Sequence, residues 1–120
     1  MTHNKNILYV DDEIINNELF SMCLKSKYNV FTSENPFEAL EIMKETSIDL
    51  LLTDFKMPGM NGIELIKEVK KDFPEKKCII ISGYVDNEII TPADAPLVFE
   101  VIMKPWKKDK LVDIINAALA

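Results

Sequence analysis

Five side chains that could carry phosphoryl chemistry each follow a short apolar run of this sequence. They belong to Asp11, Asp12, Asp54, Ser82 and Lys104. An Asp beside a divalent cation and a lysine can attack a phosphoryl group and form an aspartyl phosphate. The cation and the ammonium then stabilise the charge on the transferring oxygens. If the fold brings these side chains together, they predict phosphoryl transfer to a carboxylate.

Each of these residues also has a simpler explanation when it is taken alone. Asp12 could cap a helix, and Asp54 and Ser82 could belong to turns. Lys104 could be a solvated surface lysine. The combination is more informative than its members, because three converging carboxylates repel one another strongly unless a cation balances them.

A magnesium ion fits this combination. Mg²⁺ prefers oxygen ligands and is usually bound by one or two carboxylates and several waters. We expect Asp12 and Asp54 to coordinate the ion directly and Asp11 to act partly through water. Asp54 is the expected nucleophile, Lys104 is expected to stabilise the phosphoryl oxygens, and Ser82 is expected to donate a hydrogen bond to the acquired group.

Five short apolar runs are the expected strands that position these residues. They are 7–10, 29–32, 50–52, 79–81 and 98–103. Short runs rich in β-branched residues are typical of strands that are buried on both faces of a parallel sheet. In an open parallel sheet, ligands bind beyond the carboxyl ends of the strands. The five candidate side chains therefore belong to one edge of the sheet.

Helical patterns separate the apolar runs. The four apolar stripes are Ile15, Leu19, Met22 and Cys23; Phe37, Leu40 and Met43; Ile63, Ile66 and Val69; and Leu111, Ile114, Ile115 and Ala118. Asn35 and Pro36 add a helix-start signal, with Asn as the cap. The alternation predicts an α/β fold: a doubly wound, five-stranded parallel sheet with helices on both faces, as in flavodoxin-like proteins.

The segment after the fourth run has the weakest helical pattern. Asp86 could cap a helix over residues 86–90. Pro92 and Pro96 then work against it, because proline disrupts a helix interior and restrains the residue before it. We expect a fourth helix that is short or irregular.

Length, charge and cysteine content limit the function classes. The 120 residues fit one domain, 1–120. A net charge of −6 argues against binding to nucleic acid or to anionic membranes. Cys23 and Cys78 are expected to be small buried side chains rather than a disulfide framework. Without a signal region or an apolar stretch that could span a bilayer, the expected location is cytoplasmic.

The sequence resembles the receiver domain of two-component response regulators, including the chemotaxis type, along essentially its whole length. The segments that carry the resemblance are 8–13, 53–62, 81–84 and 103–106. The resemblance implies that a sensor histidine kinase or a phosphotransfer protein donates the phosphoryl group. It also implies a downstream protein partner or a fused output domain. Such a domain assists its own phosphorylation and dephosphorylation and is not otherwise an enzyme.

The resemblance also implies a role for each site residue. Asp54 corresponds to the phosphoacceptor, and Asp11 and Asp12 correspond to the acidic metal-binding pair. Lys56 would offer its backbone carbonyl to the metal. The resemblance further makes Ser82 the switch hydroxyl and Lys104 the lysine of the family motif.

Two features depart from the family pattern. Val101 stands where receivers usually carry Tyr or Phe, so the ring that normally moves with the switch hydroxyl is missing. The second departure is the proline-interrupted segment Thr91–Pro96, which belongs to the usual output face. Val101 leaves open a receiver-like interaction module that signals without phosphorylation. The interrupted segment indicates either a non-standard mode of partner binding or a merely shortened helix.

Two further function classes are compatible with parts of the sequence. An Mg²⁺-dependent phosphohydrolase needs a second Asp two residues after its Asp nucleophile, but Lys56 occupies that position. A flavodoxin-type flavin module needs a phosphate loop rich in Ser, Thr and Gly after the first strand. Acidic residues 11–13 stand there and would repel a phosphate. The residues therefore favour the phosphoacceptor over both.

Overall fold

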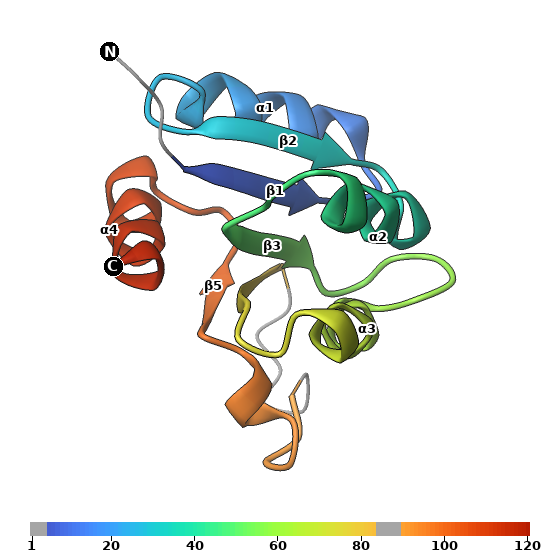
Figure 1. Cartoon of the computed structure of the whole chain (residues 1–120). Helices are drawn as coiled ribbons and strands as arrows, with labels where there is room; N and C mark the ends of the chain where they lie inside the picture. The colour runs from blue at the N-terminus through green and yellow to red at the C-terminus, as the bar shows by residue number, and fades with distance from the viewer. Residues whose placement is uncertain (1–4, 84–89) are drawn as a thin grey trace.

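A single parallel sheet forms the centre of the computed structural model, which describes residues 5–83 and 90–120 (Figure 1). The strand order is β2-β1-β3-β4-β5, and neighbouring strands pair in parallel. The strands are β1 (Asn6–Val10), β2 (Asn29–Ser33), β3 (Leu50–Asp54), β4 (Lys77–Ser82) and β5 (Glu100–Met103). The five-stranded parallel sheet is confirmed.

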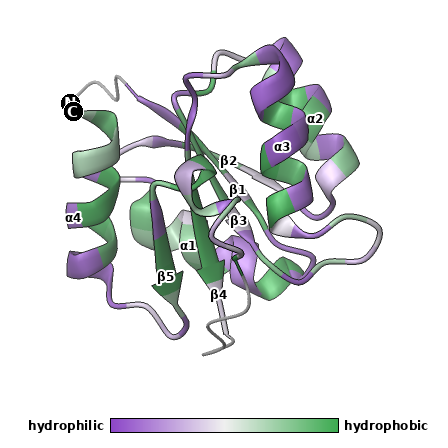
Figure 2. Ribbon diagram, turned by 90° about the horizontal axis from the view of Figure 1, so that it is seen from below, coloured by the Kyte–Doolittle hydropathy of each residue, from purple (hydrophilic) through white to green (hydrophobic). Residues whose placement is uncertain are grey.

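Within the described residues, four α-helices cover the sheet in two layers. They are α1 (Ile14–Leu24), α2 (Pro36–Glu45), α3 (Gly62–Asp72) and α4 (Lys108–Leu119). The helices α1 and α4 pack on one face, and α2 and α3 pack on the other (Figures 1 and 2). Asn35 caps α2 by accepting a hydrogen bond from the Glu38 N–H, and Pro36 is the first helical residue. The doubly wound arrangement and this helix start are therefore confirmed.

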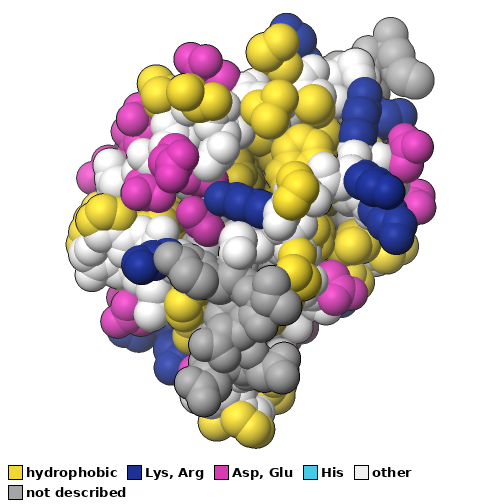
Figure 3. All heavy atoms as spheres, turned by 180° about the vertical axis from the view of Figure 1, so that it is seen from behind, with side chains coloured by type: hydrophobic (Ala, Val, Ile, Leu, Met, Phe, Trp, Pro, Cys, Tyr) yellow, Lys and Arg dark blue, Asp and Glu magenta, His cyan; other side chains and the backbone are white. Residues whose placement is uncertain are grey.

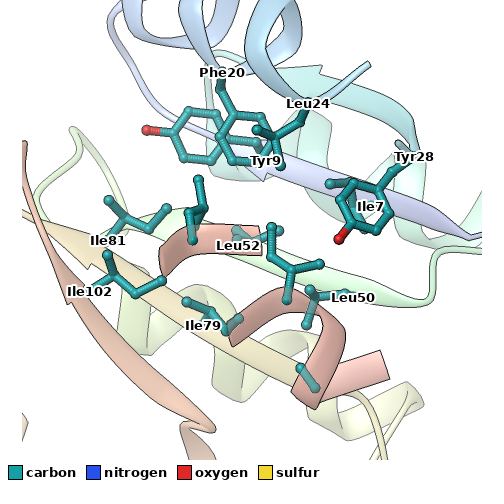
Figure 4. Packing of buried hydrophobic residues seen from close by; sticks show 13 residues of the cluster. Ile7, Tyr9, Phe20, Leu24, Tyr28, Leu50, Leu52, Ile79, Ile81 and Ile102 are labelled. Atoms are coloured by element: carbon teal, nitrogen blue, oxygen red, sulfur yellow. The ribbon is translucent and has the colours of Figure 1, made fainter. Parts of the chain in front are cut away.

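The two faces of the sheet carry two separate hydrophobic clusters, because successive side chains of a strand point to opposite faces. In β1, Ile7 and Tyr9 join the cluster under α1 and α4, whereas Leu8 and Val10 join the cluster under α2 and α3. Figure 4 shows the first cluster, in which side chains from three central strands meet those of α1. Burial on both faces explains why the central strands β1, β3 and β4 contain continuous apolar runs.

The segment between β4 and β5 is irregular where it is described. Within residues 90–99, regular helix is limited to the 3-10 turn η1 (Ala95–Leu97), which contains Pro96. The sequence predicted a short or irregular helix between β4 and β5, and this is confirmed for residues 90–99. The helix start expected at Asp86 lies outside the described residues, as does Tyr84 of the third resemblance segment.

The sequence predicted the wrong buried face for α1. Ile15 is 73% exposed and Met22 is 70% exposed, and Leu19 is also exposed. Phe20 and Leu24 are buried instead. Both sides of this helix are apolar, and periodicity alone selected the outer side. We call Ile15, Leu19 and Met22 the outer stripe of α1.

A buried asparagine explains the rotation of α1. The Asn17 side chain donates from Nδ2 to the backbone carbonyls of Asp11 (2.9 Å) and Ser33 (3.3 Å). These bonds tie the helix to the ends of β1 and β2. The two bonds hold Asn17 on the inner side of α1, where Phe20 and Leu24 are also buried.

Phe37 also differs from the expected pattern, because it is exposed in α2. Its ring faces the loop after β3: a Cβ built on Gly59 would lie 3.2 Å from Cε2 of Phe37. Gly59 has a φ of 85°, a conformation that favours glycine. Phe37 therefore lies against the loop that begins at Asp54 rather than in the core.

The two cysteines differ in exposure. Cys78 is buried as expected, but Cys23 is only partly buried and lines a groove between α1 and α4. Among the described residues, no helix is long and apolar enough to cross a membrane.

Alkylation with iodoacetamide at pH 8 should therefore modify Cys23 and spare Cys78 in the folded protein. Burial raises the pKa of the Cys78 thiol to about 11, so little of it is the reactive thiolate at this pH. Peptide mass mapping after a timed reaction measures both sites, and urea should make both react. Equal native rates at the two sites would contradict the burial of Cys78.

Candidate functional site

The register of the sheet brings the expected acidic residues to one edge. Val10, the last residue of β1, pairs with Thr53, so Asp11 and Asp54 both follow this pair. Carboxylate oxygens of Asp11, Asp12 and Asp54 all lie within 4.8 Å of one another. Asp12 does not cap α1, because the N-cap residue of that helix is Glu13.

The three carboxylates differ in exposure, and two of them, Asp12 and Asp54, border an open cavity of about 770 Å³. Asp11 is buried, Asp54 is half-buried and Asp12 is exposed. Lys56 is exposed and, with Gly83, also lines this cavity. A ligand that enters from solvent can therefore reach Asp54 beside Asp12.

Lys104 supplies a positive charge to the acidic cluster. Its Nζ lies 2.9 Å from Oδ2 of Asp11 and 3.4 Å from Oδ2 of Asp54. Burial lowers the pKa of Lys104, but the hydrogen bond to Asp11 and the charges of Asp54 and Asp11 outweigh it and raise this pKa. Burial raises the pKa of Asp54, the Lys104 charge lowers it, and the Asp11 charge raises it, with a net increase.

The Asp11 carboxylate accepts four hydrogen bonds from the described residues. Its Oδ2 accepts from the Tyr9 hydroxyl (2.8 Å), the Asn16 side-chain amide (3.1 Å) and the Lys104 ammonium (2.9 Å). Its Oδ1 accepts from the Glu13 N–H at 2.9 Å. The sequence analysis missed Tyr9 and Asn16. Tyr9 has a signal, since it lies two residues before Asp11 and so on the same face of the extended chain.

The donor set fits a divalent cation that prefers oxygen. Three carboxylates meet one ammonium, so negative charge is in excess at the cavity. Burial is the main cause of the raised pKa of Asp54, and the neighbouring Asp11 charge raises it further. A small cation bound by carboxylates would relieve the repulsion.

The family model of the response regulator receiver domain matches residues 7–116. This match covers nearly the whole chain. The chain belongs to the response regulator receiver domain family. The family supports the receiver interpretation over the phosphohydrolase and the flavin module.

Several known proteins are similar to this receiver domain. Sporulation initiation phosphotransferase F of Bacillus subtilis is 32% identical and is covered over 94% of its length, with 97% of this chain. The hydrogenase transcriptional regulatory protein HoxA of Cupriavidus necator is 34% identical over 94% of this chain. The chain spans only 24% of the length of that regulator.

Two solved receiver structures resemble this one closely. A receiver domain from Clostridium thermocellum has a TM-score of 0.89 and 32% identity, over 97% of this chain and 94% of that chain. The response regulator TrrA from Thermotoga maritima has a TM-score of 0.87 and 30% identity, over 97% of this chain and 100% of that chain. The TrrA structure is a complex with Mg²⁺-BeF.

The remaining expected residues lie near the acidic edge of this receiver. Ser82 is buried at the end of β4, and its backbone carbonyl accepts a hydrogen bond from the Lys104 N–H at 2.8 Å. Val101 lies on β5 and is 38% exposed. The structure therefore places Ser82 directly beside Lys104 in the sheet, and Val101 on the partly open face of β5.

Proposed function

We propose that this receiver domain takes a phosphoryl group onto Asp54 in the presence of Mg²⁺. The donor would be a phosphohistidine on a sensor histidine kinase or on a phosphotransfer protein. One observation carries the proposal: the Asp54 carboxylate lies at an open cavity within 4.8 Å of two other carboxylates and 3.4 Å from the Lys104 ammonium.

The reaction uses groups that this chain supplies. An oxygen of Asp54 forms a bond to phosphorus while the phosphorus–nitrogen bond of the phosphohistidine breaks. The electron pair stays on the imidazole nitrogen, which is free to take a proton from solvent. Asp11, Asp12, Asp54 and the backbone carbonyl of Lys56 would hold Mg²⁺, which would stabilise charge on the transferring oxygens.

Lys104 and Ser82 would bind the new phosphoryl group. Lys104 already lies between Asp11 and Asp54, so a short movement of its ammonium reaches an oxygen added to Asp54. The phosphoryl group brings about −1.5 to −2 charge, which attracts the ammonium and the Ser82 hydroxyl. This movement biases the backbone at the ends of β4 and β5.

The outer stripe of α1 supports a protein as the phosphodonor. Ile15, Leu19 and Met22 are all exposed on one side of α1, and Asn16 of the same helix lines the phosphoacceptor cavity. Figure 3 shows hydrophobic side chains gathered on this side of the molecule, between acidic side chains and lysines. Exposed apolar surface rimmed by charge is typical of protein interaction sites.

Intact mass spectrometry after incubation with acetyl phosphate tests the proposal. We expect one phosphoryl adduct with MgCl₂ and none when EDTA replaces the metal. Calorimetric titration with MgCl₂ measures metal binding independently. If neither an adduct nor Mg²⁺ binding appears, the interaction module that works without phosphorylation becomes the better explanation.

A further inference from the structure

Tyr9 contacts the acidic cluster from inside the protein. Its hydroxyl donates to Oδ2 of Asp11 at 2.8 Å, and both residues are buried. The roles proposed above for the site residues do not involve Tyr9. An apolar residue would fill the same place in the core, so the hydroxyl itself needs an explanation.

The core holds the Tyr9 ring firmly. The ring stacks on Phe20, with centroids 4.2 Å apart and planes within 10° (Figure 4). Phe20 in turn contacts Trp106 edge to face at 6.1 Å. A phenol hydroxyl can donate a hydrogen bond, whereas an ionised carboxylate can only accept one. The direction of its hydrogen bond is therefore fixed.

The Tyr9 hydroxyl shares Asp11 with Lys104. Both groups donate to the same oxygen, Oδ2, and the ammonium also lies near Asp54. The neutral Tyr9 hydroxyl keeps the Asp11 carboxylate in place without the help of the Lys104 ammonium. Lys104 can then move toward Asp54 without leaving Asp11 unsatisfied.

We propose that Tyr9 is a positioning residue for Asp11, which orients this carboxylate toward Asp12 and Asp54 for Mg²⁺ binding. This inference rests on the proposed function. Hydrogen-bond partners of metal-binding carboxylates fix their orientation, and losing one typically weakens metal binding tenfold or more. Tyr9→Phe keeps the ring and its stacking but removes the hydroxyl. We expect the dissociation constant for Mg²⁺ to rise about tenfold.

Tyr28→Phe is the matched control. Tyr28 belongs to the same hydrophobic cluster and also loses one phenol hydrogen bond, which is partly buried and goes to Oδ1 of Asn116 at 2.6 Å, away from the acidic edge. Calorimetric titration of each folded variant with MgCl₂ alone gives the dissociation constant without any phosphodonor. Trp106, the only tryptophan, provides an independent fluorescence signal for the same titration. Tyr28→Phe should leave Mg²⁺ affinity within about twofold of the wild type.

A double-mutant cycle separates positioning from general destabilisation. Asn16 is half-buried and donates to the same Asp11 oxygen, so Asn16→Ala should also weaken Mg²⁺ binding. If both residues act through Asp11, their combined effect on Mg²⁺ affinity should differ from the product of the single effects. Thermal unfolding measures the stability of each variant in parallel. If Tyr9→Phe is less stable, these data give the folded fraction with which its Mg²⁺ affinity is corrected.

The outcomes distinguish this inference from the proposed function. If the wild type binds Mg²⁺ and Tyr9→Phe binds it equally well, the positioning role is wrong and the proposed function stands. Additive effects of Tyr9→Phe and Asn16→Ala would also overturn the shared route through Asp11. If the wild type does not bind Mg²⁺, the magnesium site and the positioning role fall together.

Discussion

Replacing Asp54 with Asn should abolish the phosphoryl adduct completely. A side-chain amide is not a nucleophile towards phosphorus, whereas the Asp54 carboxylate lies at the open cavity beside Lys104. The substitution keeps the size of the side chain and removes one of three crowded carboxylates. The variant should therefore fold at least as stably as the wild type, as judged by urea denaturation.

Asp49→Asn is a suitable control for this experiment. Asp49 lies at the opposite end of β3, where its carboxylate accepts a hydrogen bond from the Asn6 N–H at 2.8 Å. Intact mass after incubation with acetyl phosphate and MgCl₂ should show an adduct on Asp49→Asn and none on Asp54→Asn. An adduct of unchanged yield on Asp54→Asn would place the phosphoacceptor at another residue.

Gly62→Ala should have the largest effect on stability. A Cβ at this position would lie 2.6 Å from the backbone oxygen of Asp54 and 3.1 Å from Cα of Phe55. Both contacts are to backbone and cannot be relieved by rotating a side chain. A capping box with Asn61 and a 2.7 Å bond from the Gly62 N–H to the Phe55 carbonyl fix the start of α3.

We expect Gly62→Ala to lower the free energy of unfolding by about 3 kcal/mol, as for other overpacked sites. In the interior of an ordinary helix, replacing Gly with Ala would raise the free energy of unfolding by about 1 kcal/mol. A decrease for Gly62→Ala would therefore indicate a steric clash. Gly83→Ala is the control, because a Cβ at Gly83 meets nothing within 4 Å, and it should change stability by less than about 0.5 kcal/mol. Urea denaturation measures both variants. A Gly62→Ala protein as stable as the wild type would mean that α3 can shift away from β3.

Most of the fold could be predicted from the sequence because the central strands β1, β3 and β4 contain uninterrupted apolar runs. Runs such as Leu50–Leu52 have no polar alternation, and only burial on both faces explains this. Once the strands were parallel, the side chains after their carboxyl ends had to meet at one edge. The convergence of Asp11, Asp12, Asp54 and Lys104 followed from this rule.

The rotation of α1 could not be predicted in the same way. Apolar residues line two sides of this helix, and hydrophobic periodicity cannot tell which side is buried. The choice depends on Asn17, whose partners are backbone carbonyls contributed by β1 and β2. Those contacts exist only in the folded chain. Phe37 was misplaced for a related reason, since it packs on a loop distant in sequence.

The shell around Asp11 was also beyond sequence reasoning. Tyr9 was assigned to an apolar run, which correctly places its ring but says nothing of its hydroxyl. The alternation of side chains along the strand places Tyr9 and Asp11 on the same face, and the tyrosine side chain is long enough for its hydroxyl to reach the Asp11 carboxylate. The phosphoacceptor role of Asp54 and the Lys56 carbonyl remain predictions until an adduct and Mg²⁺ binding are measured.

The two apolar sides of α1 separate the demands of folding from those of recognition. Asn17, Phe20 and Leu24 lock the inner side, and the outer stripe contributes little to the core. If the outer stripe contacts the phosphodonor as proposed, substitutions in it would alter the choice of phosphodonor while the domain still folds. A lineage that duplicates such a domain could then redirect one copy to a new signalling partner through a few surface residues, leaving the acidic cluster unchanged.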